Sequence, residues 1–153
     1  MSNVLERFRG LSGMEFYTNA CNLRHELEYF LMNDKNVPKR HRSNYSYPII
    51  NLVNSMIDYI ILANKIYPYT VDKVQEKKNL FQKSIDCIDL IYERFQGAIQ
   101  DLWWQVLHAP EDSPGYKRRI EIEHRLECVG NMLYDEEKLL RGTKDKVRLL
   151  KRK

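Results

Sequence analysis

The chain has 153 residues, of which 43% are hydrophobic and 30% are charged, and its formal net charge is +4. This length supports one domain with a single core, and the hydrophobic content excludes an intrinsically disordered chain. Only six glycines and five prolines accompany abundant Leu, Ile, Glu, Lys and Arg, which favours an all-helical protein.

Residues 1–13 contain three small residues near their end and no sustained hydrophobic period, so we expect an N-terminal arm, flexible or only partly helical, there. From residue 14 to residue 32, apolar side chains recur at steps of three and four. This spacing predicts an amphipathic helix about 30 Å long. Its inward residues are expected to be Phe16, Ala20, Leu23, Leu27, Phe30 and Leu31.

A second helix is predicted from Ser46 to about Lys65, with Pro48 in its first turn, where proline is tolerated. Apolar residues cover most of its circumference, so it is either the central helix of a bundle or a helix that also faces a neighbouring subunit. Polar residues interrupt the apolar run before it reaches the length of a membrane span. We therefore predict that this helix is buried in protein and that the chain has no membrane contact.

A third helix is predicted from Val71 to His108, with Thr70 as its cap. Its apolar stripe averages 3.5 residues per step, as in left-handed bundle packing. Unbroken, it would span about 57 Å, so it either projects beyond the bundle or bends, and Gly97 is the favoured place for a bend. Trp103 falls on the stripe and is predicted to be core, while Trp104 lies at its edge, as a partner anchor or a half-buried residue.

A turn at residues 110–115 precedes a fourth helix, predicted from Tyr116 to Leu140 and ended by Gly142. Residues 143–153 are then a basic tail. The boundaries 1–13, 14–142 and 143–153 thus describe an arm, an antiparallel up-down four-helix bundle and a tail. The inward residues of the fourth helix are expected to be Ile120, Leu126 or Ile122, Val129, Leu133 and Leu140.

Three widely spaced cysteines, Cys21, Cys87 and Cys128, each lie in a helical apolar pattern. This usage is typical of reduced core thiols in a cytoplasmic protein. Arg7 and Arg9 interrupt the early apolar stretch, so we expect no signal segment.

The positive charge is concentrated in two segments. From Lys138 onward there are eight basic residues and one acidic residue, a local charge of +7, and a second basic segment spans residues 39–42. Because two aromatic residues follow that loop, phosphate contact with base stacking is favoured, and a solvated basic surface is the plain alternative. The predicted nucleic-acid-binding residues are Lys39, Arg40, Arg42, Lys144, Lys146, Arg148, Lys151, Arg152 and Lys153.

Two spacings in the fourth helix are typical of catalytic or metal sites. Arg119 and His124 match the Arg-x4-His spacing of HEPN ribonucleases, in which a guanidinium holds the phosphate and an imidazole moves the proton. About one such match is expected by chance in a chain of this composition, so a solvated basic face is favoured. Glu121 and His124 have the Glu-x-x-His spacing of di-metal bundles, but that site needs the motif twice. We therefore predict no metal, no cofactor and no catalytic residue.

The order of these segments resembles a bacterial four-helix-bundle family. The resemblance lies in an aromatic-led first helix, a Val-Pro-Lys-Arg loop at residues 37–40, a second helix ending Ala-Asn-Lys at residues 63–65, and Val-Gly-Asn-Met-Leu at residues 129–133. In these features the chain is similar to the accessory variability determinant proteins of diversity-generating retroelements, which are related to proteins encoded by ribosomal RNA intervening sequences. The similarity covers roughly residues 16–133. Asn131 departs from the family's usual basic residue, and the hairpin at residues 104–119 is longer than usual.

The resemblance implies a homopentameric barrel that binds a reverse transcriptase and its template RNA, or an RNA/DNA hybrid, during mutagenic copying. Lys39 and Arg40 match the family's basic pair, and a ring would bury Tyr59 and Ile61 against a neighbouring subunit. The predicted function is therefore a non-enzymatic retroelement accessory protein, with Trp104 and Tyr59 as partner-binding residues. The alternatives are a HEPN-like ribonuclease and a structural bundle without a nucleic-acid role.

Overall fold

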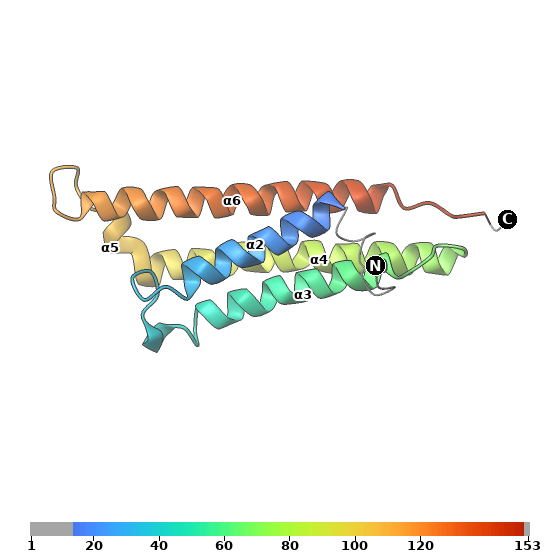
Figure 1. Ribbon diagram of the computed structural model, residues 1–153, viewed down its shortest axis with the longest axis horizontal. Coiled ribbons are helices and arrows are strands. Elements are labelled where there is room, and N and C mark those ends of the chain that lie inside the picture. Colours follow the sequence, from blue (N-terminus) through green and yellow to red (C-terminus); the bar gives the residue numbers. More distant parts are fainter. Residues whose placement is uncertain (1–13, 152–153) are drawn as a thin grey trace, which may run out of the picture.

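The computed structural model describes residues 14–151, and the regular secondary structure of this part of the chain is entirely helical, with no β-strand. It confirms the predicted all-α class. Four long helices lie side by side along one axis (Figure 1), and α3 and α6 each pack against both α2 and α4. These helices are α2 (Glu15–Leu31), α3 (Ser46–Asn64), α4 (Val71–Ala98) and α6 (Tyr116–Asp145). The predicted arm at residues 1–13 lies outside the described residues.

The connections between the helices gather at the two ends of the bundle (Figure 1). One end, here called the hairpin end, holds residues 32–45 with the short 3-10 helix η1 (Lys39–His41), and the α4–α6 connection. The other, here called the terminal end, holds residues 65–70 between α3 and α4 together with the last described residues, 146–151.

The helix boundaries follow local sequence signals. The predicted first helix is one residue longer at each end than α2, and α3 ends one residue before the predicted Lys65. Pro48 lies in the first turn of α3, and Thr70 caps α4 by accepting a hydrogen bond from the backbone N–H of Lys73 at 3.2 Å.

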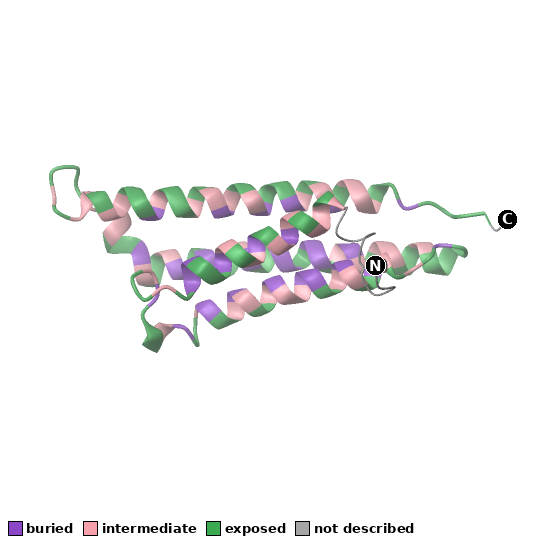
Figure 2. Ribbon diagram, in the orientation of Figure 1, coloured by how far each residue is buried: buried purple, intermediate pink, exposed green. Residues whose placement is uncertain are grey.

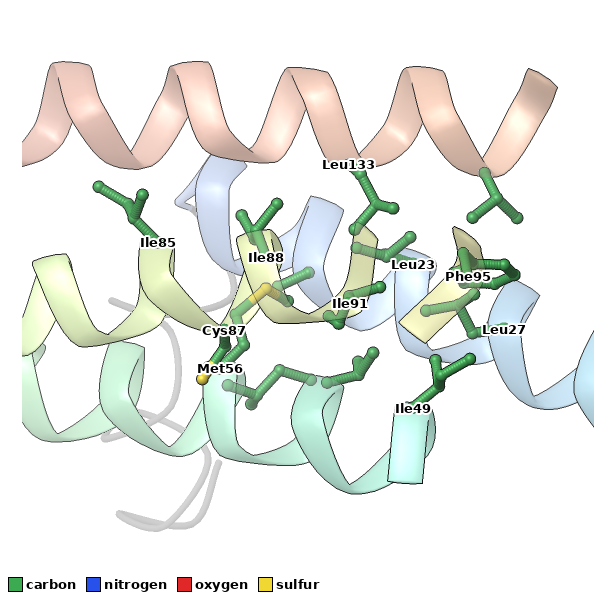
Figure 3. Close-up of a cluster of buried hydrophobic side chains, with 14 of the residues drawn as sticks. Leu23, Leu27, Ile49, Met56, Ile85, Cys87, Ile88, Ile91, Phe95 and Leu133 are labelled. Carbon is green, nitrogen blue, oxygen red and sulfur yellow. The ribbon is translucent and has the colours of Figure 1, made fainter. Parts of the chain in front are cut away.

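The core is built from the inward faces of all four long helices, where the buried residues concentrate (Figure 2). Figure 3 shows Leu23, Met56, Ile88 and Leu133, one from each helix, pointing toward a common interior. Two buried serines allow close helix approach because their hydroxyls are satisfied. Ser46 donates to the Leu31 carbonyl at 2.6 Å, and Ser84 donates to the Met56 carbonyl at 3.0 Å.

The predicted long third helix is interrupted one residue after Gly97. There α4 gives way to a π-helical segment, η2 (Ile99–Trp103), followed by the short α5 (Trp104–Leu107). A π-turn adds a residue to the helical repeat and rotates the residues after it about the helix axis. Trp103 is core, 2% exposed, as its place on the helical stripe predicted, and its indole N–H donates to the Asn36 carbonyl at 2.9 Å.

Two predictions for the fourth helix are wrong. Ile120 is 46% exposed, and the buried residue of that turn is Ile122. Gly142 does not end the helix, because α6 continues to Asp145 and the Thr143 hydroxyl donates to the Leu139 carbonyl at 2.8 Å. A single glycine costs a helix only about 1 kcal/mol, which packing on either side of it offsets.

The three cysteines are free, but only Cys87 is buried, and burial raises the pKa of its thiol. Cys21 and Cys128 are half-buried, which corrects the prediction of three core thiols.

By length and composition alone, α3 is also the one helix in residues 14–151 that could cross a membrane, with a mean hydropathy of 1.2 over its most apolar window. The core helix of a soluble protein meets the same criterion. On its outer side α3 presents Tyr47 and Leu62, which are both exposed.

Candidate nucleic-acid interface

The basic loop between α2 and α3 is held by a buried arginine. The Arg42 guanidinium donates to the Met32 carbonyl at 2.7 Å, to the Val37 carbonyl at 3.4 Å, and to the Asp34 carboxylate at 2.5 Å. Val37 is itself fully buried, so the loop is anchored on both sides of Pro38. This anchoring leaves the exposed Lys39 and Arg40 projecting from η1 at the hairpin end.

Arg42 is therefore a structural residue, which corrects the prediction that it contacts nucleic acid. Its side chain is almost fully buried, and the two carbonyls that accept from it belong to the loop that it shapes. Lys39 and Arg40 keep their candidate role.

A cleft of about 300 Å³ opens beside η1. Four segments build it: the α2–α3 loop, the π-helical η2, the short α5, and the first two turns of α6. Charged, polar and apolar side chains all line it. The charged and ionisable lining residues are Lys35, Arg40, His41, Asp101 and Arg118, and the apolar ones include Leu102, Trp103, Val106 and Ile122. We call this site the hairpin-end cleft.

Arg118 ties α6 to the loop. Its Nη2 donates to the Lys35 carbonyl at 2.7 Å and to the Asn36 side-chain oxygen at 2.6 Å, while Glu121 lies 3.5 Å from Nη1. These contacts fix the guanidinium plane at the cleft. A fixed guanidinium loses little entropy when it binds a phosphate or carboxylate.

The opposite wall is ordered by two further hydrogen bonds. Arg40 Nε donates to His41 Nε2 at 3.1 Å, which makes that ring nitrogen an acceptor. The Tyr45 hydroxyl donates to Asp101 Oδ2 at 2.5 Å, and this bond raises the pKa of Tyr45. Three basic side chains (Lys35, Arg40 and Arg118) thus share the cleft with one carboxylate, so its chemistry favours an anionic ligand.

Lys35 and Arg118 are cleft residues that the sequence did not predict. Lys35 is an isolated basic residue, whereas Arg118 lies in a basic run of its own at residues 117–119, and the two are separated by 83 positions. Only the folding of α6 onto the α2–α3 loop brings them together. Arg118 adjoins Arg119, the residue that the Arg-x4-His spacing selects.

The tail residues lie at the opposite end of the bundle from this cleft. With 30 residues, α6 is about 45 Å long, and that length separates the two basic regions. Lys144 is inside α6 and donates to the Gln82 side chain at 2.7 Å, and Arg148 donates to the carbonyls of Asp145 and Val147. Lys146 and Lys151 are exposed, while Arg152 and Lys153 lie outside the described residues.

The segment after α6 is not a free arm along its whole length. Val147 is buried, and the Leu150 N–H donates to the Pro68 carbonyl at 2.8 Å. Residues 146–151 therefore pack on the α3–α4 connection, and the two predicted basic segments do not form one surface.

The two predicted partner-binding residues differ in accessibility. Trp104 is 53% exposed at the hairpin end, with its ring 4.0 Å from the His108 ring. Tyr59 is half-buried on α3, with the Lys83 ammonium 5.7 Å from its ring centroid.

Arg119 and His124 do not meet within the chain. Arg119 Nε binds Glu123 at 2.8 Å and its Nη1 donates to the Ala109 carbonyl at 2.9 Å, whereas the His124 ring lies 3.7 Å from Cys128 Sγ. Five positions along a helix place two side chains about 140° apart, so one chain does not direct this pair at one phosphate.

Within residues 14–151 there is no group of three or more His, Cys, Asp or Glu side chains arranged to hold a metal ion. Neither the models of known protein families, nor the curated proteins, nor the solved structures contain a match to this chain.

Proposed function

We propose that this protein is a non-enzymatic RNA-binding accessory protein of a diversity-generating retroelement, which binds a reverse transcriptase and its template RNA or RNA/DNA hybrid. The RNA-binding part of the proposal rests on the hairpin-end cleft. The retroelement part rests on the resemblance across residues 16–133.

The observation that carries RNA binding is the convergence of Lys35, Arg40 and Arg118 on one cleft from distant parts of the chain. Two of the three are guanidinium groups, which bind phosphate oxygens in a planar, directional way. Lys39 is exposed in the same short helix as Arg40 and extends the positive surface beyond the cleft. The tail supplies a second, sequence-independent electrostatic contact at the far end.

Partner binding is assigned to the same end of the molecule. Trp104 is a large, exposed aromatic residue on α5, and such residues dominate the energetics of protein interfaces when a partner covers them. We place reverse-transcriptase docking on Trp104, beside the cleft that receives the RNA.

In the proposed assembly, antiparallel up-down bundles form a cytoplasmic homopentamer through the outer side of α3. This side carries Tyr47 and Leu62, with the half-buried Tyr59 and Ile61 between them in sequence. A neighbouring subunit that packs on this side would cover these side chains. Light scattering after size exclusion is expected to give about five times the 18.4 kDa chain mass, and a monomer would overturn the ring.

The test of RNA binding is a salt series with a fluorescent single-stranded RNA, followed by anisotropy. Arg40→Gln and Arg118→Gln are each expected to weaken binding and to reduce the salt slope by roughly 0.7 to 1 for each phosphate that is no longer neutralised. Arg94→Gln, at an exposed position on α4, is the matched control for loss of one positive charge. A structural bundle without a nucleic-acid role predicts that the cleft variants and the wild type bind equally poorly.

The ribonuclease alternative is separated by a second assay on the same preparations. Arg119→Ala and His124→Ala are expected to leave the integrity of the RNA and its binding unchanged. Cleavage by the wild type that disappears in both variants would replace the accessory role by an enzymatic one.

A further inference from the structure

The hairpin-end cleft contains a carboxylate that phosphate binding does not explain. Asp101 is exposed at the cleft and is held there by the Tyr45 hydroxyl at 2.5 Å. A negative charge beside Arg40 and Arg118 repels a phosphate, so a site for phosphate alone would be better without it. The carboxylate instead fits a ligand that carries hydrogen-bond donors as well as an anion.

The apolar part of the cleft lining points to the same kind of ligand. Leu102 and Val106 are half-buried and Ile122 is buried, so the cleft offers apolar side chains among its charged ones. A volume of about 300 Å³ lies at the lower bound of small-molecule sites, comparable to one nucleotide. A flat base covers apolar side chains, and its edge presents N–H donors.

We infer that the hairpin-end cleft takes one unpaired nucleotide of a single-stranded RNA. The base packs on Leu102 and Val106, its phosphate lies between Arg40 and Arg118, and an N–H of its edge donates to Asp101. Tyr45 is a positioning residue that fixes the acceptor. This inference rests on the proposed RNA-binding function and adds to it the form of RNA that is recognised.

Duplex RNA does not fit this site. Bases in an A-form helix are stacked and paired, and their edges are occupied, so a duplex contacts the cleft only through its phosphates. The wild type is therefore expected to bind a short single strand roughly five- to tenfold more tightly than the matching duplex at the same salt concentration.

Two variants, Val106→Phe and Asp101→Asn, test the two contacts to the base. Val106→Phe narrows the cleft without changing charge, and is expected to abolish the preference for the single strand while leaving duplex binding intact. Val71→Phe is its matched control, because Val71 is exposed at the start of α4, at the terminal end. Thermal melting establishes that each variant is folded.

Asp101→Asn distinguishes base contact from phosphate contact by the direction in which it changes RNA affinity. The asparagine keeps an oxygen that accepts from the Tyr45 hydroxyl. If Asp101 accepts from the base, the substitution weakens single-strand binding and strengthens duplex binding. If only phosphates are bound, it removes a repulsive charge and strengthens both equally, which would overturn the inference while leaving RNA binding in place. Failure of the wild type to bind either RNA would instead overturn the proposed function.

Discussion

The side-chain amide of Asn19 on α2 donates to Glu136 Oε2 on α6 at 2.9 Å, and within residues 14–151 this is the one hydrogen bond that the buried carboxyl group of Glu136 makes. Glu136 is 0% exposed, and its other oxygen has no partner among these residues. Asn19 also lies 3.4 Å from the Met132 carbonyl, so a single amide links α2 to one turn of α6. Burial raises the pKa of Glu136 from its ordinary value of 4.5 to about 8, against the opposing effect of the Asn19 bond.

This pKa makes the stability of the bundle depend on pH in a defined window. Between pH 4.5 and about 8 the folded protein holds a proton on Glu136 that the unfolded chain has released. The free energy of unfolding therefore falls as pH rises through that window, by at most about 1.4 kcal/mol per pH unit from this group. Glu136→Gln, which resembles the protonated acid, is expected to remove that fall and to be more stable than the wild type above the window.

The measurement is urea unfolding of both proteins at several pH values, compared as a difference so that other titrating groups cancel. Glu137→Gln is the matched control, because the neighbouring Glu137 is only half-buried and pairs with Arg141 at 3.0 Å. A stability difference between Glu136→Gln and the wild type that stays constant with pH would contradict the raised pKa.

The sequence carries a signal for the burial of Glu136 that its residue type obscures. Ile122, Leu126, Val129, Leu133 and Leu140 lie on one stripe with alternating steps of four and three, and residue 136 completes it. A carboxylate on such a stripe is an unexpected core residue because carboxylates are rarely buried. The hydrophobic period therefore predicts the position of Glu136 better than its residue type does. The raised pKa of Glu136 follows from burying a carboxyl group at that position.

Helix positions were predictable because spacing and punctuation are local. The candidate site was only half predictable. Arg118 lies in a basic run of its own at residues 117–119, and only its contact with Asn36, 82 residues away, brings it to Arg40, which lies in the basic run at residues 39–42. The same run also contains Arg42, whose burial no local pattern reveals. The basic run at residues 39–42 thus pointed to one side of the cleft, but it also led to the assignment of the structural Arg42 to nucleic-acid binding.

Arg42 is expected to contribute to stability. Arg42→Ala removes the donor to two backbone carbonyls and the partner of Asp34, and we expect a loss of about 2–3 kcal/mol in the free energy of unfolding. Arg40→Ala removes an exposed side chain two residues away and should change stability by less than about 0.5 kcal/mol. Denaturant unfolding distinguishes the two, and equal effects would show that the loop is not anchored by Arg42.

Charge and packing in the C-terminal segment are separable. Val147 is buried where residues 146–151 lie on the α3–α4 connection, so Val147→Ala should lower stability by about 1–2 kcal/mol. Lys146→Gln, at the exposed neighbouring position, should leave stability unchanged and weaken RNA binding slightly. Removal of residues 143–153 is expected to change both properties, so it does not isolate the role of charge. Thermal melting measures the stability of the two point variants, and anisotropy measures their RNA binding. A loss of stability in Lys146→Gln together with a loss of RNA binding in Val147→Ala would contradict this account.

The adjacent tryptophans provide a spectroscopic test of the packing at the hairpin end. Trp103 is 2% exposed and Trp104 is 53% exposed, so the two indoles differ in solvent contact. Trp104→Phe is expected to shift the emission to shorter wavelength, to reduce quenching by acrylamide and to leave stability within about 0.5 kcal/mol of the wild type. Trp103→Phe should leave the emission of Trp104, which acrylamide quenches. It should lower the free energy of unfolding by about 1–3 kcal/mol, since the Asn36 carbonyl loses its indole donor. Equal quenching in the two variants would contradict the burial of Trp103 against the α2–α3 loop.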